Sequence, residues 1–140
     1  MPRKIKSLMM ISLLLASSLL ADPPVSNTVD VAGLSAPALV AYCRNVKSFV
    51  WTVKNTGTAV NGTPYTPIMY AISSNTASRA TMIEATCSWQ SVTGGTFIAT
   101  FPSNTLTTAG YWIYGVGLKD SGTNVTIITQ GRLSIRPDPF

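Results

Sequence analysis

The strongest constraint on the fold is a two-residue alternation of apolar and polar side chains between Thr108 and Arg136. The apolar residues that share a phase are Trp112, Tyr114, Val116 and Leu118 in the first half and Val125, Ile127, Leu133 and Ile135 in the second. Between the halves, Asp120, Ser121 and Gly122 are of the kinds that reverse a chain in a tight turn. The pattern predicts two strands whose apolar face must be covered by a second layer, because a lone strand pair is unstable in water.

The same alternation recurs upstream, at intervals typical of a β-sandwich. The predicted apolar sets are Leu39, Ala41 and Cys43; Phe49, Trp51 and Val53; Ile68, Tyr70 and Ile72; Thr81, Ile83, Ala85, Cys87 and Trp89; and Phe97, Ala99 and Phe101. No stretch of about a dozen residues has a helical period. We therefore predict an all-β fold, an immunoglobulin-like antiparallel β-sandwich of about seven strands over residues 38–137. A small β-barrel is the alternative.

The first 21 residues have the order of a secretory signal peptide. A basic head (Arg3, Lys4 and Lys6) precedes an apolar run of 13 residues at 8–20, and a polar, proline-containing stretch follows. Spanning a bilayer takes about 20 apolar residues, so an uncleaved membrane anchor is the less favoured alternative. The sequence predicts that residues 1–21 are a signal peptide, that the protein is exported or virion-associated, and that no stable membrane span remains after cleavage.

The net charge of the whole chain largely describes this leader. Three of the ten basic residues lie in it, which leaves seven basic against five acidic residues and a net charge of +2. The remaining basic residues are scattered along the sequence rather than clustered. The sequence therefore argues against a nucleic-acid partner.

Two short segments flank the predicted sandwich. Residues 22–37 are rich in Pro, Asn, Ser and Thr without sustained periodicity, which predicts a flexible N-terminal arm that can add a strand to a neighbour's sheet. Residues 138–140 are expected to form a C-terminal tail. The open edges of a sandwich, together with such an arm, also make a homo-oligomer a candidate assembly.

Cys43 and Cys87 both lie on the apolar phase of their predicted strands. Export would place them in an oxidising compartment, where two cysteines form a disulfide readily. Two buried free thiols are the equal alternative, because the phase of a strand does not show whether two sulfurs meet. A zinc site is not expected, since two cysteines without any histidine leave the metal short of ligands.

The sequence offers little for catalysis. It contains no histidine, which removes the commonest general base and the usual catalytic triads. The acidic residues are Asp22, Asp30, Glu84, Asp120 and Asp138, all far apart along the chain. We therefore expect that the protein is not an enzyme and uses no cofactor.

A candidate binding surface lies at the loop that contains Pro64 and Tyr65. Together with Trp89 and Trp112, this loop can form an aromatic surface. The alternative is that these aromatic residues are core or edge packing, because large aromatic side chains supply much of the buried area of a small domain.

Several short motifs between Val46 and Pro137 carry a resemblance to a known module. They are the strand and glycine turn at 49–57, Thr63-Pro64-Tyr65, the segment 107–114, the turn at 119–122 and the closing segment 130–135. In these motifs the chain resembles the N-terminal β-sandwich domain of phage baseplate upper proteins and related tail-fibre modules. The resemblance implies a non-enzymatic virion part that docks other tail proteins, and it carries over no catalytic residue.

The sequence thus leads to two functional hypotheses. The first is a structural or interaction module of a phage or prophage virion, of the tail or baseplate type, with other virion proteins as its partners. The second is a secreted or periplasmic domain that binds a surface glycan or a cell-surface partner protein.

Overall fold

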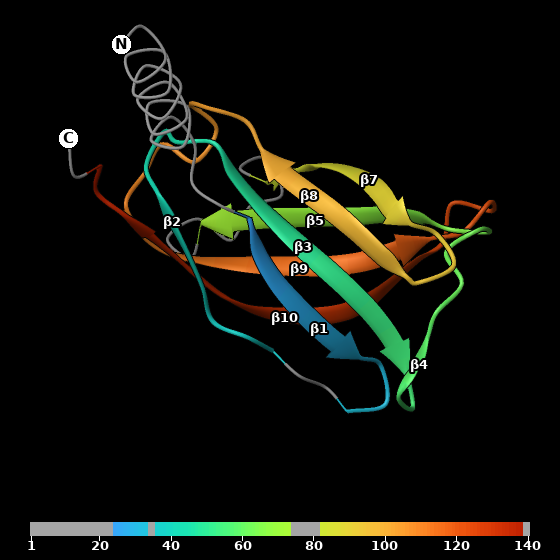
Figure 1. Cartoon of the computed structure of the whole chain (residues 1–140). Helices are drawn as coiled ribbons and strands as arrows, with labels where there is room; N and C mark the ends of the chain where they lie inside the picture. The colour runs from blue at the N-terminus through green and yellow to red at the C-terminus, as the bar shows by residue number, and fades with distance from the viewer. Residues whose placement is uncertain (1–23, 34–35, 74–81, 139–140) are drawn as a thin grey trace, which may run out of the picture.

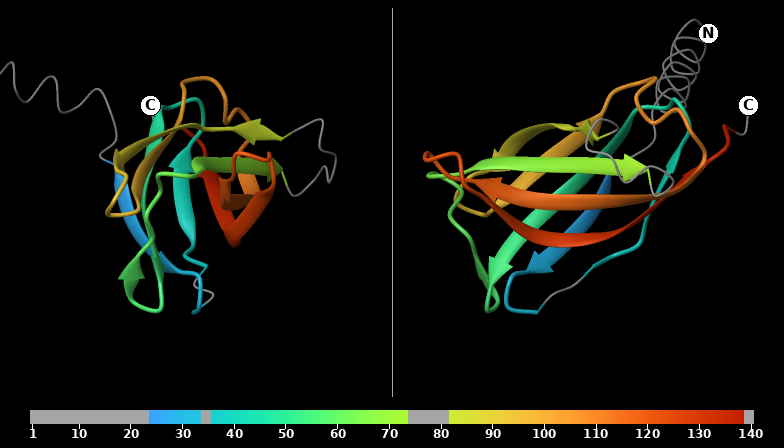
Figure 2. Two further views of the ribbon diagram at one scale, coloured as in Figure 1. Left: turned by 90° about the vertical axis from the view of Figure 1, so that its right-hand side faces the viewer. Right: turned by 180° about the vertical axis from the view of Figure 1, so that it is seen from behind.

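The computed structural model describes residues 24–33, 36–73 and 82–138, which form ten strands and no helix (Figure 1). The strands are β1 (Val25–Asp30), β2 (Leu39–Tyr42), β3 (Lys47–Asn55), β4 (Thr58–Ala59), β5 (Thr66–Ser73), β6 (Ile83–Glu84), β7 (Thr86–Ser91), β8 (Thr96–Phe101), β9 (Gly110–Lys119) and β10 (Val125–Arg136). They build two sheets that face each other as separate layers (Figure 2). Sheet A has the order β1-β3-β8-β7, with β4 beside β3, and sheet B has the order β2-β10-β9-β5-β6.

The strand order confirms the predicted immunoglobulin-like sandwich. Six strands, β3, β8 and β7 in one sheet and β10, β9 and β5 in the other, follow the B-E-D and G-F-C order of that fold. The sheets are mixed rather than purely antiparallel, because β1 pairs with β3 and β2 pairs with β10 in parallel. The reason is that the chain alternates between the sheets at its start: β1 and β3 lie in sheet A, and β2, which separates them in sequence, lies in sheet B.

The segment 22–37 contains a regular strand, so the expectation of a flexible arm there was wrong. Strand β1 pairs with β3 over six residues, from Val25 opposite Phe49 to Asp30 opposite Lys54. Val29 on this strand is 1% exposed and belongs to the core. The strand escaped prediction because its inward phase is interrupted by a polar residue, Asn27. The predicted signal peptide lies outside the described residues, and residue 138 is exposed after the end of β10.

Most of the predicted apolar sets do form the core between the sheets. Fully buried side chains come from β3 and β8 of sheet A and from β2, β9 and β10 of sheet B. Trp51 and Tyr114 meet across the layers with their ring centroids 5.7 Å apart. The Tyr114 hydroxyl donates to the Pro37 carbonyl, and burial raises the pKa of this phenol to about 12. The contact between Trp51 and Tyr114 joins the two sheets at the centre of the sandwich.

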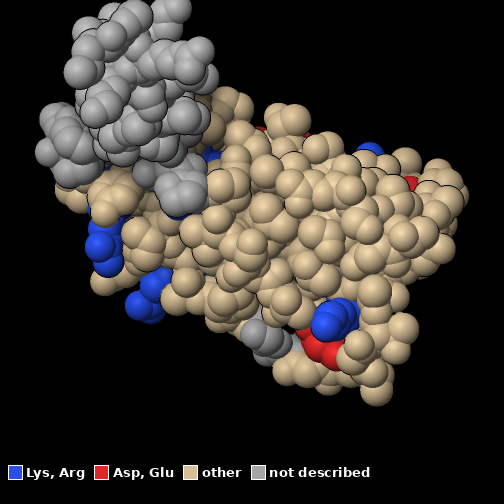
Figure 3. All heavy atoms as spheres, viewed as in Figure 1, with Lys and Arg blue, Asp and Glu red and all other residues tan. Residues whose placement is uncertain are grey.

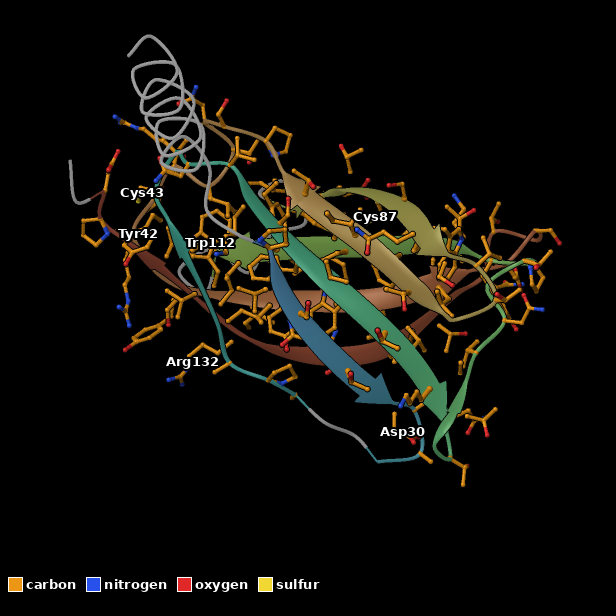
Figure 4. All side chains as sticks on the ribbon, viewed as in Figure 1. Asp30, Tyr42, Cys43, Cys87, Trp112 and Arg132 are labelled. Carbon is orange, nitrogen blue, oxygen red and sulfur yellow. The ribbon has the colours of Figure 1, made fainter. Side chains whose placement is uncertain are left out.

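Asp30 joins two loops at one end of the sandwich. Its carboxylate accepts backbone N–H groups of Ala32 (2.9 Å), Thr56 (2.9 Å) and Gly57 (2.7 Å), so the end of β1 is tied to the β3–β4 turn. These hydrogen bonds hold the pKa of Asp30 below its ordinary value, and the nearby Lys54 contributes least. Figure 4 labels Asp30 at the lower right of the sandwich, and Figure 3 shows acidic and basic side chains next to each other at the lower right of the same view.

We expect the Asp30→Asn variant to melt at a lower temperature than the wild type at neutral pH. Because the folded pKa is depressed, the stabilisation is present above the unfolded pKa of about 3.9 and is lost as the pH falls through the folded value. The difference in Tm should therefore shrink below that range, as measured by thermal denaturation between neutral and acid pH. A Lys54→Gln control should lower the Tm at neutral pH much less than Asp30→Asn does, because Lys54 contributes least to the depressed pKa of Asp30; an equal loss of Tm would contradict the dominant role of the backbone hydrogen bonds.

Candidate functional site

The two outer faces of the sandwich differ in chemistry. On sheet A, hydroxyl groups pair across neighbouring strands, with Ser48 2.8 Å from Thr100 and Thr52 3.1 Å from Thr96. This is the polar, solvated face that an antiparallel sheet normally presents to water. It faces the viewer in Figure 3, where most of its surface carries no charge. Sheet B is in front in the right panel of Figure 2. Its outer face carries exposed apolar side chains instead.

We call this surface the sheet B face. Its members are the outward side chains of three long strands and the residues beside β6: Ile68, Tyr70, Ile72, Met82, Glu84, Tyr111, Ile113, Val125, Ile127, Gln130 and Arg132. Tyr111 is 61% exposed, Ile113 50% and Ile127 41%. Contiguous exposed apolar surface of this kind is uncommon on soluble domains and usually marks a contact region.

Strand β5 contributes to this face because both of its phases are apolar. The predicted inward set was Ile68, Tyr70 and Ile72, and this prediction was wrong. The structure buries Met69 and Ala71 instead, at 1% and 0% exposure, and leaves the predicted set half-buried on the outside. An alternation shows which residues share a face but not which face is covered when both are apolar.

A β-bulge in β10 supplies the rest of the face. Ile127 pairs with Gly117 and Thr129 pairs with Val116, so Ile128 is an extra residue between two registered pairs. The bulge reverses the phase of the strand, and Val125 and Ile127 point outward while Leu133 and Ile135 remain in the core. The prediction that these four residues share one buried phase was therefore wrong for the first two.

At the centre of the sheet B face, β9 carries glycine and contributes no side chain. A Cβ atom on Gly115 would lie 2.3 Å from the ring of Tyr70, so the ring occupies the space that a side chain would take. The Tyr70 hydroxyl accepts a hydrogen bond of 2.8 Å from Gln130 Nε2 on the far side of β9. The hydrogen bond to the Tyr70 hydroxyl thus holds the ring over Gly115, so this part of the face is ordered before any partner binds.

Two shallow depressions interrupt the face. One, of about 480 Å³, lies between β9 and β10 beside Tyr111, Ile113 and Arg132, and the Arg132 guanidinium is 4.7 Å from the centre of the Tyr111 ring. The other, of about 420 Å³, has an apolar lining with Glu84 at its rim. Figure 4 shows that Arg132 projects away from the sandwich. An exposed aromatic ring beside an arginine is typical of protein interfaces.

The aromatic surface predicted at Pro64 and Tyr65 is not one unit in the structure. Trp89 packs over Gly62 and donates a hydrogen bond of 3.1 Å to the Tyr65 carbonyl, so the indole fastens this loop to β7. Trp112 is buried in sheet B and donates to the Thr108 carbonyl at 2.9 Å. Pro64 and Tyr65 are exposed in this loop, but the larger apolar surface is the sheet B face, which no sequence motif had indicated.

Cys43 and Cys87 are both free thiols in the structure, which is one of the two alternatives that the sequence left open. Cys43 directly follows β2 of sheet B, whereas Cys87 lies on β7 at the edge of sheet A, and Figure 4 shows them well apart. Burial raises the pKa of the Cys87 thiol to about 11. This thiol is therefore protonated at neutral pH and is a poor nucleophile.

Two of the acidic side chains, Asp30 and Asp120, have structural partners in turns. Asp120 accepts backbone N–H groups of Gly122 and Asn124, both at 2.9 Å, in the turn between β9 and β10, as Asp30 does at its own turn. Within the described residues, no three His, Cys, Asp or Glu side chains gather where they could hold a metal ion. The same residues include no helix with the length and hydropathy needed to cross a bilayer.

Comparison with known proteins gives a likeness in structure but not in sequence. No family model and no curated protein matches the chain. The N-terminal domain of phage TP901-1 ORF48 is similar in structure, with a TM-score of 0.61 and 11% identity over 81% of this chain and 98% of that one. This likeness shows the fold, and it confirms the expected resemblance at the coarse level of a domain from a phage protein.

Two further solved structures are more distant. They are the solution structure of amebosin, with a TM-score of 0.40 and 9% identity over 82% of this chain and 100% of that one, and PbICP-C in complex with falcipain-2, with a TM-score of 0.36 and 7% identity over 81% and 92%. These TM-scores are too low to bear on the fold or on what this chain does.

Proposed function

We propose that this protein is a non-enzymatic structural module that assembles with other proteins in a phage or prophage virion. The observation that carries the proposal is the sheet B face, where exposed isoleucine, valine and tyrosine side chains form a continuous surface beside Arg132. Such a surface gains free energy when a partner covers it, whereas a lone soluble domain would gain nothing from exposing it. The shared fold of a phage protein domain supports the viral setting.

The build of the face suits assembly more than chemistry. The polar groups of the sheet B face are few. They lie at its margin or hold its aromatic side chains in place, as Gln130 holds Tyr70. Interfaces combine such an apolar centre with aromatic residues and arginine. The carboxylates of Asp30 and Asp120 accept backbone N–H groups at their turns, so these two acids serve the fold.

A secreted or periplasmic binding domain is the second candidate. The observation that favours it is the depression beside Tyr111, where an aromatic ring, the Gln130 amide and the Arg132 guanidinium border one shallow hollow. An exposed ring with polar groups next to it can stack on a sugar and hydrogen-bond to its hydroxyls. Under this candidate the ligand is a surface glycan or a partner protein.

Particle association separates the two candidates. In the phage or lysogen that encodes the chain, we expect the protein to sediment with purified particles, and Ile113→Asp to lower its incorporation at least about tenfold, which corresponds to about 1.4 kcal/mol. The reason is that a partner would bury the new carboxylate. Mass spectrometry of gradient-purified particles measures this.

The matched control is Val92→Asp, an exposed apolar residue in the β7–β8 turn, which should leave incorporation unchanged. A protein that is abundant outside the cells but missing from the particles would contradict the virion assignment. Retention of that protein by a glycan array would then favour the second candidate.

A further inference from the structure

We infer that the sheet B face docks against the same face of a second copy of this chain, with the two-fold axis parallel to the strands. The inference rests on the proposed function, since it names the first partner of the same surface. Three features of the face carry it: the lack of a β9 side chain at Gly115 and Gly117, the opposite charges on its two sides, and the absence of a like-charge conflict among Glu84, Arg132 and Lys119 in that arrangement.

Two sheets stack closely only where no protruding side chain holds them apart. Packed sheets lie about 10 Å apart and align within about 30°, which requires that their facing side chains form even layers. On the sheet B face, the Tyr70 ring lies across Gly115, and Ile68 and Ile127 flank Gly117. At Gly115 and Gly117, β9 therefore has no side chain that would hold a second sheet away, whereas Tyr111 and Ile113 of the same strand are exposed beyond them.

The charges of the face stand on opposite sides of its apolar centre. Glu84 is on the edge strand β6, in the cross-strand row that runs through Tyr70, Gly115 and Gln130. Arg132 is on β10, one step further along, in the row of Ile113 and Ile72. One side is thus acidic and the other basic.

A two-fold axis between β9 and β5 turns this asymmetry into complementarity. The rotation places β10 of one copy over β6 of the other, so that Arg132 comes beside Glu84 of the second copy, twice in the dimer. An isologous interface always repeats each contact in this way. The same rotation places Ile113 over Ile72 and adds apolar burial at the centre.

The remaining charges near the face are Lys119 and Arg136. Arg136 is exposed on the same phase as Arg132 and lies beyond the row of Ser73, at which β5 ends. Lys119 on β9 is registered with Thr66 on β5, so the rotation places the lysine over an uncharged residue. Rotation about an axis perpendicular to the strands would instead leave Glu84 over its own strand and Arg132 over its own strand. Charge complementarity therefore selects the parallel axis.

A charge swap in the purified protein tests the inference. We expect the wild type to dimerise with a Kd below about 100 μM, and Arg132→Glu or Glu84→Arg alone to weaken the dimer at least about tenfold. The double variant with both changes should recover a Kd within about threefold of the wild type, because the pairs re-form with their signs exchanged. Sedimentation equilibrium measures the constants, and thermal melts show whether each variant is folded.

Lys54→Glu on sheet A is the matched control and should leave the dimer unchanged. A monomer at concentrations of about 500 μM, or a folded double variant that fails to recover, would overturn the inference. A monomer that still enters particles would leave the proposed function standing and assign the face to another protein. A dimer that is missing from particles would support the inferred dimer and contradict the proposed function.

Discussion

Trp51→Ala is expected to lower the free energy of unfolding by about 3–5 kcal/mol, the usual cost of removing a buried indole. Trp51 is fully buried on β3 in sheet A and meets Tyr114 of sheet B with ring centroids 5.7 Å apart. Its loss leaves a cavity between two sheets whose backbones are held by their own hydrogen bonds, so the site cannot collapse fully. Urea denaturation followed by circular dichroism measures the change.

Trp51→Phe is the matched control for this prediction. Within the described residues, the indole Nε1 has no hydrogen-bond partner, so phenylalanine removes no bond and leaves a smaller cavity. We expect it to cost less than half as much as alanine. Equal losses in the two variants would indicate that the indole nitrogen, rather than packing, holds the layers together.

Val29→Asp is expected to destabilise the protein by about 3 kcal/mol or more, because it places a carboxylate in the core. Val29 is 1% exposed on β1, where it pairs with Val53. Since β1 is an edge strand, the loss is limited by the free energy of releasing that strand. Denaturation measures the total, and hydrogen exchange of the amides from β1 and the facing edge of β3 shows whether the strand has left the sheet.

Thr28→Asp provides the neighbouring control, since Thr28 is exposed on the outer side of the same strand. It should change the free energy of unfolding by less than about 0.5 kcal/mol. If Val29→Asp proved as mild as this control, the segment would be the flexible arm that its composition suggests, and the domain would begin at β2.

Together these features describe a domain with two unlike surfaces. The hydroxyl pairs of sheet A suit contact with water, and the apolar platform of sheet B suits contact with protein. If the inferred dimer forms, the sheet B face is covered within the dimer. The loops and the outer face of sheet A then remain available to the rest of an assembly. The proposed module and the inferred dimer are thus compatible parts of one account.

The strand periodicity was predictable wherever one phase was apolar and the other polar. Phe49, Trp51 and Val53 alternate with polar or smaller neighbours and are all in the core. The prediction failed for β5, whose Pro67, Met69 and Ala71 compete with the other phase for the interior. The prediction failed for β1 because Asn27 interrupts the apolar phase of this strand. The burial of β1 depends on its pairing with β3.

The candidate site was less predictable than the fold. The aromatic loop at Pro64 and Tyr65 was found from residue types, but Trp89 is used to fasten that loop and Trp112 is buried. The sheet B face arises from residues on three strands, and their common exposure follows from the pairing of those strands. Residue types alone carry no information on that pairing.

The amino-acid sequence by itself determined that the chain forms short strands in two layers, because a two-residue period fixes which side chains share a face. The tertiary structure decided which of those faces meets the core. The bulge at Ile128 turns Val125 and Ile127 outward after a register set by β9. Burial depends on how the sheets pack against each other. The sheet B face therefore exists only once β5, β9 and β10 have paired.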